Sequence, residues 1–112
     1  VIDYLNRIRL PFNINTIAQH AAIAAIKDQQ FIKKAIKHNN LWKPFIEKEL
    51  INLGIQIIPG VGNFVLAKFN NPKQANDCNN YLEKHNIFVR KVLEYGLADC
   101  LRITVGLEKE NT

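Results

Sequence analysis

The chain has 112 residues, which suffices for one small domain with a core of its own. Its apolar fraction of 47% is ordinary for a globular protein. It contains no apolar run of about 18 residues, the length that a membrane-spanning helix requires. The net charge of +5 is spread along the chain from Lys27 to Lys109, so most lysines read as solvated helix faces. We therefore expect no membrane partner and no nucleic-acid partner.

The cysteines and histidines carry no recognisable chemistry. Cys78 and Cys100 do not form a C-x-x-C pair, and we expect two reduced, mostly buried thiols. The three histidines are His20, His38 and His85. Their spacing from each other and from the cysteines is not that of metal ligands. We therefore expect no metal site. The first residues lack the pattern of a secretory signal, which makes the cytoplasm the expected location.

Three helices are expected in the first half of the chain. Residues 1–9 have apolar positions at helical spacing without a capping residue, as at the end of a longer helix, and Pro11 breaks the pattern. Asn15 can cap an alanine-rich helix over residues 16–27. Asp28 is expected to end that helix and to cap the next one.

The third helix is amphipathic and runs to Gly54. Its apolar residues fall near one face, and lysines occupy much of the other. Pro44 lies inside this pattern, where it marks either a new first turn after Asn39 and Asn40 or a kink. Gly54 is well suited to close the helix.

Short elements fill the second half. Strands are expected at 55–58, 63–69, 87–92 and 100–105, with a helix that starts near Pro72 and a first helical turn at 108–111. The resulting order, α-α-α-β-β-α-β-β, predicts an α+β fold in which a small, largely antiparallel sheet of about four strands packs against helices. Both ends of the chain read as cut from something larger.

Arg90 and Arg102 are the main site candidates. Each lies in an apolar, strand-like segment, and this region holds two of the chain's four arginines, whereas the chain has eleven lysines. An arginine in such a run is costly to bury without an anion, and its planar fork suits carboxylate or phosphate. The pair therefore predicts an anion site across two adjacent strands. The alternative is a pair of edge or outer-face arginines that pair with Glu94 or Asp99.

Other candidates are weaker. Gly96 can supply a positive φ in the turn with Tyr95, for which a substrate role is a lesser possibility. The Gly60–Asn63 loop lacks the spacing and the following helix of a phosphate cradle, so Asn63 is expected to start a strand and hold the turn. Cys78 and His85 share a helical stripe about 10 Å apart along the axis, so we interpret them as core or core-edge residues rather than a catalytic pair. His20 is interpreted as a packed or capping residue.

Several collinear motifs resemble one family. They are Pro11-Phe12-Asn13-Ile14-Asn15, His38-Asn39-Asn40 with Trp42 and Pro44, Asn63-Phe64-Val65-Leu66, Val89-Arg90, Tyr95-Gly96-Leu97 and Leu101-Arg102-Ile103-Thr104-Val105-Gly106. Over essentially the whole chain they resemble the C-terminal small domain of histidinol-phosphate aminotransferase, a pyridoxal-phosphate enzyme of the aspartate aminotransferase fold. The sequence departs from the family's usual serine, proline and threonine at Gly60, Ala98 and Leu107, and none of these changes removes a charged contact.

The resemblance implies roles for the two arginines. Arg102 would bind the α-carboxylate of the amino-acid substrate, and Arg90 would help to bind the substrate phosphate. The cofactor lysine and the acid at the pyridinium nitrogen would lie in a large domain upstream of Val1. No lysine of this chain matches the family's serine-lysine setting, so no catalytic, cofactor-binding or metal-binding residue is expected here.

The resemblance also implies the domain organisation and the activity. Residues 1–112 would be a small-domain fragment, with 1–10 as the end of a helix that links it to the large domain of the same polypeptide. The parent enzyme, expected to be a homodimer, would transfer an amino group between histidinol phosphate and 2-oxoglutarate in histidine biosynthesis. Pyridoxal phosphate is expected in the full-length enzyme and not on the isolated chain, which should fold without transaminating.

Three alternatives remain open. Within the same fold, the chain resembles the small domain of an aromatic aminotransferase or of a threonine-phosphate decarboxylase, both of which keep the carboxylate arginine. The third alternative belongs to another class of protein, a small basic binding module for nucleic acid or acidic protein. A binding module predicts a contiguous basic face and steeply salt-dependent affinity, and the dispersed lysines argue against it.

Overall fold

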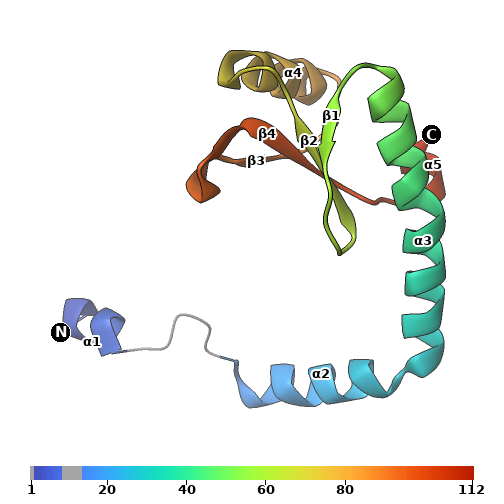
Figure 1. Cartoon of the computed structure of the whole chain (residues 1–112). Coiled ribbons are helices and arrows are strands. Elements are labelled where there is room, and N and C mark those ends of the chain that lie inside the picture. Colours follow the sequence, from blue (N-terminus) through green and yellow to red (C-terminus); the bar gives the residue numbers. More distant parts are fainter. Residues whose placement is uncertain (1, 9–13) are drawn as a thin grey trace. The chain divides into compact units, whose positions relative to one another are not determined.

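The computed structural model describes residues 2–8 and 14–112 and divides into two compact units, Val1–Ala35 and Ile36–Thr112 (Figure 1). The first unit contains α1 (Ile2–Ile8) and α2 (Thr16–Lys27). Helix α3 (Gln29–Asn52) begins in the first unit and ends in the second. The predicted connector around Pro11 lies outside the described residues.

Two side-chain caps set the limits of α2 and the start of α3. Asn15 accepts a hydrogen bond from the Ala18 backbone amide at 2.8 Å, which satisfies one of the free N–H groups of the first turn. Asp28 accepts in the same way from the amide of Phe31 at 2.9 Å. The predicted range of α2 and both predicted caps are confirmed.

Helix α3 is continuous through Pro44, so of the two alternatives for this proline the new first turn after Asn39 and Asn40 is wrong. A proline in a helix interior removes the hydrogen bond to the carbonyl four residues earlier, here that of Asn40. Asn40 is exposed, so water can satisfy this carbonyl and the helix tolerates the loss. The helix ends as predicted at Gly54, where φ is +78° and Ile55 donates back to the Leu50 carbonyl at 3.0 Å.

The second unit is built on a four-stranded antiparallel sheet with the order β1-β2-β4-β3. The strands are β1 (Gln56–Ile58), β2 (Phe64–Lys68), β3 (Arg90–Val92) and β4 (Leu97–Thr104). Besides the C-terminal part of α3, its helices are α4 (Pro72–Lys84), the short 3-10 helix η1 (Leu93–Tyr95) and α5 (Glu108–Asn111). The predicted α+β class, element order and antiparallel sheet are confirmed.

The predicted third strand is too long at its start. Residues 87–89 are not in the sheet, because the chain leaves α4 through a turn in which Asn86 has φ of 60° and Ile87 donates to the Leu82 carbonyl at 2.9 Å. Strand β4 is longer than predicted and begins at Leu97, directly after the turn at Gly96.

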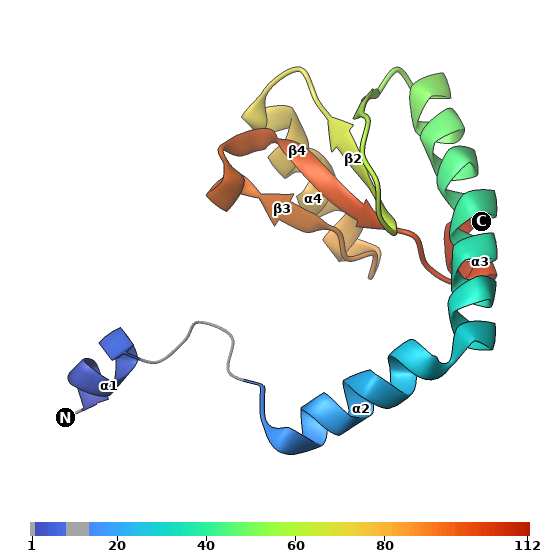
Figure 2. The ribbon, with the colours of Figure 1, turned by 60° about the horizontal axis from the view of Figure 1, so that its bottom comes forward.

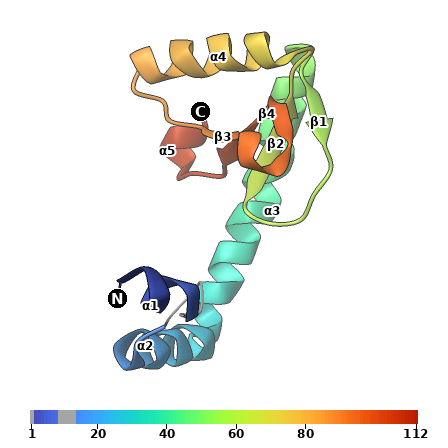
Figure 3. The same ribbon diagram turned by 90° about the vertical axis from the view of Figure 1, so that its left-hand side faces the viewer.

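Helix α4 covers one face of the sheet (Figures 2 and 3), and the core lies between the two. The buried cluster consists of Ala67, Phe69, Ala75 and Leu101. Ala67 on β2 and Ala75 on α4 are both small, which lets the helix approach the sheet closely.

Two predictions about buried residues have different outcomes. His85 is exposed, with Nδ1 2.8 Å from the Tyr81 carbonyl oxygen, so its predicted place at the core edge is wrong. Asn79 takes a buried position instead, 1% exposed, and donates to Glu83 at 2.8 Å. Cys100 is buried, Cys78 is partly buried, and both are free thiols as predicted.

Within residues 2–8 and 14–112, the structure shows no helix with the length and apolar character needed to span a bilayer. The same residues show no group of three or more histidine, cysteine or acidic side chains arranged to hold a metal ion.

Candidate functional site

Arg90 and Arg102 lie directly opposite each other on β3 and β4. Side chains of residues paired in this way leave the same face of an antiparallel sheet. The row continues across β2 and β1, because Arg102 is paired with Leu66 and Leu66 with Ile58. The predicted placement of the two arginines on adjacent strands is confirmed, and we call their two guanidinium groups the arginine pair.

The arginine pair points away from α4. The next residue, Lys91, donates from Nζ to Oδ1 of Asn76 on α4 at 2.7 Å, and it lies opposite the buried Leu101. Since successive side chains in a strand leave opposite faces, Arg90 and Arg102 belong to the other face. Figure 2 shows no helix of residues 36–112 over that face. Within residues 36–112, no helix therefore stands between the arginine pair and an incoming anion.

Arg90 has a carboxylate partner. Its Nη2 donates to Oε1 of Glu94 at 2.9 Å, and the guanidinium carbon lies 6.0 Å from the centre of the Tyr95 ring. The hydrogen bond to Glu94 raises the pKa of Arg90. The same bond lowers the pKa of the Glu94 carboxyl, and the charge of Arg102 lowers it further by a smaller amount. Of the partners named in the alternative reading, Glu94 therefore pairs with Arg90.

Arg102 has no such partner among the described residues. Asp99 lies 3.9 Å from Lys68 instead. The guanidinium carbon of Arg102 lies 5.3 Å from the centre of the Phe64 ring, and its buried Nε has no hydrogen-bond partner within residues 2–8 and 14–112. A buried donor without a partner costs about 1–3 kcal/mol. Arg102 is therefore a charged side chain with a donor for which the described residues supply no acceptor.

The η1 turn brings Glu94 back to Arg90. Leu93–Tyr95 form one turn of 3-10 helix that ends at Gly96, whose amide donates to the Leu93 carbonyl at 3.0 Å. Gly96 has φ of +75°, as predicted from the Tyr-Gly turn. The tight turn places a carboxylate four residues after Arg90 within reach of its guanidinium.

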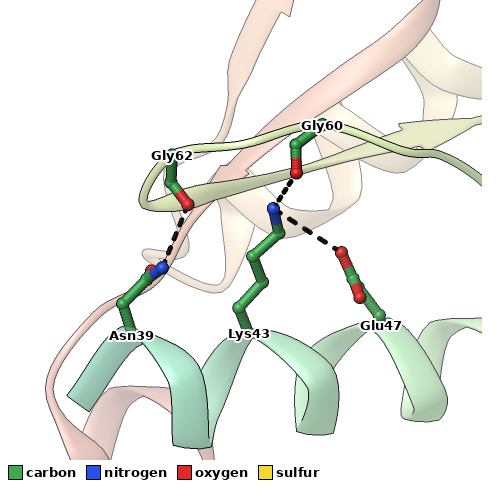
Figure 4. Close-up of polar contacts among 5 residues, drawn as sticks. All are labelled: Asn39, Lys43, Glu47, Gly60 and Gly62. Atoms are coloured by element: carbon green, nitrogen blue, oxygen red, sulfur yellow. Dashed lines mark hydrogen bonds and ion pairs between the residues drawn. The ribbon is translucent and has the colours of Figure 1, made fainter. Parts of the chain in front are cut away.

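The loop between β1 and β2 is held against α3 by polar side chains of that helix (Figure 4). Asn39 donates to the Gly62 carbonyl at 3.2 Å, and Lys43 donates to the carbonyl of Gly60 and lies 3.9 Å from Glu47. The carbonyls of Gly60 and Gly62 thus accept hydrogen bonds from side chains of α3, which gives this loop a structural role as a turn. The spacing of Asn39, Lys43 and Glu47 by four residues on one helix face was the available signal.

Helix α3 thereby supports β2 and β4, the two strands that carry Phe64 and Arg102. Gly62, which accepts the hydrogen bond from Asn39, lies two residues before Phe64, and the ring of Phe64 contacts Arg102. His38, next to Asn39, has Nε2 2.8 Å from the carbonyl oxygen of Gly106, just after β4. Consecutive residues of α3 therefore fix the start of β2 and the end of β4.

Comparison with solved structures places this arrangement in a known fold. A protein assigned as an aminotransferase from Burkholderia pseudomallei K96243 superposes with a TM-score of 0.77 at 24% identity, covering 98% of this chain and 33% of that one. A protein assigned as a histidinol-phosphate aminotransferase from Erwinia carotovora atroseptica SCRI1043 gives a TM-score of 0.72 at 24% identity, covering 98% and 31%. The fold is that of a segment of the aminotransferases.

The sequence profile described as "Aminotransferase class I and II" matches residues 1–112. The chain belongs to the class I and II aminotransferase family. It is similar to the histidinol-phosphate aminotransferases of Maricaulis maris (strain MCS10), at 42% identity, and Paramagnetospirillum magneticum (strain ATCC 700264 / AMB-1), at 39% identity. Each match covers 99% of this chain, which spans 31% of the length of either relative.

Proposed function

We propose that residues 1–112 act as the small domain of a pyridoxal-phosphate-dependent aminotransferase, in which the arginine pair binds the anionic group of the substrate. The observation that carries this proposal is the direct pairing of Arg90 with Arg102 on a sheet face that no helix of residues 36–112 covers. The whole enzyme, in this proposal, joins these residues to a larger domain of the same polypeptide and is a homodimer. Residues 1–10 then form the end of the helix that links the two domains.

The proposed reaction exchanges an amino group between histidinol phosphate and 2-oxoglutarate. The names of the relatives at 42% and 39% identity support this substrate pair. Histidinol phosphate carries a phosphate and no carboxylate, whereas 2-oxoglutarate carries carboxylates. A site that serves both substrates in turn must therefore accept a phosphate in one half of the reaction and a carboxylate in the other.

The two arginines suit this task. A guanidinium donates two parallel, charge-assisted hydrogen bonds to carboxylate or phosphate oxygens. We assign Arg102, whose Nε has no partner among residues 2–8 and 14–112, to the substrate carboxylate, and Arg90 to the phosphate. Because the two guanidiniums leave the sheet side by side, they orient the substrate by its anionic end and leave its amino group free to reach the cofactor.

The cofactor itself does not fit the described residues. Pyridoxal phosphate, when bound, supplies the electron sink for transamination and requires a lysine that forms a Schiff base. All eleven lysines lie in the described part of the chain. Lys43 is committed to Gly60 and Glu47, Lys68 lies 3.9 Å from Asp99, and the other nine are exposed, so none lies in an enclosed site where a Schiff base would be protected from water. We therefore place the cofactor lysine outside these 112 residues and assign no catalytic residue within them.

Kinetics of the whole enzyme test this proposal. Arg102→Gln should raise KM for 2-oxoglutarate, and Arg90→Gln should raise KM for histidinol phosphate, each by about 10-fold or more because a charge-assisted hydrogen bond is lost. Lys84→Gln, which removes an exposed cation at the end of α4, is the control and should change neither constant. Unchanged KM values in both arginine variants would contradict the proposed anion site, and activity only on aromatic amino acids would favour the related aromatic aminotransferase.

A further inference from the structure

Glu94 is an acidic residue that faces a site for anions. Its Oε1 lies 2.9 Å from Nη2 of Arg90, and Arg90 is directly opposite Arg102. Two like charges opposite each other in a sheet destabilise it. The carboxylate of Glu94 offsets this repulsion, and it occupies a donor of Arg90, the residue that the proposed function assigns to the substrate phosphate.

The contact is built into the fold. Glu94 lies in η1, and the positive φ of Gly96 closes the turn that returns the chain from β3 to β4. The next residue, Tyr95, has its ring 6.0 Å from the Arg90 guanidinium. The turn therefore presents a carboxylate and a ring to the same guanidinium.

The ion pair is open enough to be exchanged. The side chains of Arg90 and Glu94 are 49% and 52% exposed. Exposed ion pairs contribute little net stability, because water and salt screen them. An incoming phosphate or carboxylate can therefore take the place of Glu94 without disturbing the sheet.

We propose that Glu94 is an internal counter-ion of the arginine pair, which a substrate anion displaces and which lowers the affinity of the site more for dianionic phosphate than for carboxylate. This inference rests on the proposed function. The negative charge of Glu94 repels a ligand in proportion to the ligand's own charge. Glu94 thus brings the affinities of the two substrate anions closer together, as a site that binds them alternately requires.

The size of the effect follows from Coulomb's law. A unit charge removed about 6 Å from the ligand in a water-like medium should tighten binding about 3-fold for a monoanion and about 10-fold for a dianion. Salt reduces both factors, so the comparison requires constant ionic strength.

The experiment is direct calorimetric titration of the whole enzyme, with the cofactor bound so that its own phosphate site is filled. The probes are inorganic phosphate, mainly a dianion at a pH of about 8, and acetate as the carboxylate. Glu94→Gln should tighten phosphate by about 10-fold and acetate by about 3-fold. Glu94→Asp keeps the charge and should stay closer to wild type. Glu49→Gln, which neutralises an exposed glutamate on α3, is the matched control and should change neither affinity.

Several outcomes would overturn the inference. Equal or weaker phosphate binding in Glu94→Gln would make Glu94 a positioning residue for Arg90, and equal tightening of both probes would remove its role in selectivity. A failure of wild type and Glu94→Gln alike to bind phosphate would also overturn it. Tightening without turnover of histidinol phosphate would support the inference and contradict the proposed function, whereas turnover without tightening would do the reverse.

Discussion

The ring of Phe64 lies under the guanidinium of Arg102, with 5.3 Å between the ring centre and the guanidinium carbon. The two residues come from neighbouring strands, Phe64 at the start of β2 and Arg102 near the end of β4. A cation over an aromatic face is held in place without using its hydrogen-bond donors. Phe64 therefore orients Arg102 and leaves its N–H groups free for an anion.

Replacing Phe64 by leucine should weaken substrate binding. The interaction of a cation with an aromatic ring contributes about 0.5–1 kcal/mol at an exposed site, so KM for 2-oxoglutarate should rise by about 2- to 5-fold with kcat little changed. Steady-state kinetics of the whole enzyme measures this. Phe88→Leu, at a residue 77% exposed, is the control, and an equal rise in both variants would argue against a role for the ring.

Gly96→Ala should destabilise the protein through backbone strain alone. Gly96 has φ of +75°, and an added Cβ there meets no atom within 4 Å. The left-handed conformation costs an alanine about 1–2 kcal/mol, which chemical denaturation can measure. Gly60→Ala is the matched control, because a Cβ at Gly60 also meets open space and its φ is not positive. A loss of stability at Gly60 equal to that at Gly96 would contradict this explanation.

Lys43→Met should loosen the β1–β2 loop. The substitution keeps most of the apolar stem and removes the hydrogen bond to the Gly60 carbonyl and the ion pair with Glu47. Hydrogen exchange of the backbone amides from Val61 to Asn63 should become faster, because local opening requires less free energy. Lys48→Met, at an exposed lysine of the same helix, should leave this exchange unchanged. Unaltered exchange in Lys43→Met would show that Asn39 holds the loop by itself.

The two thiols should differ in reactivity. Cys100 is 1% exposed and Cys78 is partly buried, and burial raises the pKa of both thiols. Alkylation with mass-spectrometric detection should therefore modify Cys78 first. A raised pKa in the folded state means that the protonated thiols stabilise the fold below the pKa of the unfolded chain, and this contribution falls as the pH rises through the folded value. Replacement of Cys100 by alanine should flatten this alkaline loss of stability.

The sequence predicted the helices and the sheet well where local chemistry decides structure. Asn15 and Asp28 are caps because their short side chains reach free amides of the next turn. Gly54 and Gly96 adopt the positive φ that the ends of a helix and a turn require. The continuity of α3 at Pro44 was open because a proline removes one hydrogen bond and crowds the carbonyl four residues earlier, and the sequence does not show that Asn40 is exposed to water there.

The site was predicted in part. The placement of Arg90 and Arg102 on adjacent strands followed from two apolar segments joined by a turn, but their direct opposition depends on the irregular register between Lys91 and Val92. The contact of Phe64 with Arg102 joins residues far apart in the chain, and sequence spacing does not show such contacts. The roles of the two arginines in substrate binding stay predictions until the variants are measured.

Strand β3 forms one edge of the sheet, and its first two residues are Arg90 and Lys91. An edge strand exposes unpaired backbone N–H and C=O groups to which another chain can add, and charged side chains there oppose such pairing. Arg90 projects from one face and Lys91 from the other, so a foreign strand would meet a positive charge on either side. The residue that we assign to substrate phosphate thus also protects the open edge of the sheet against aggregation.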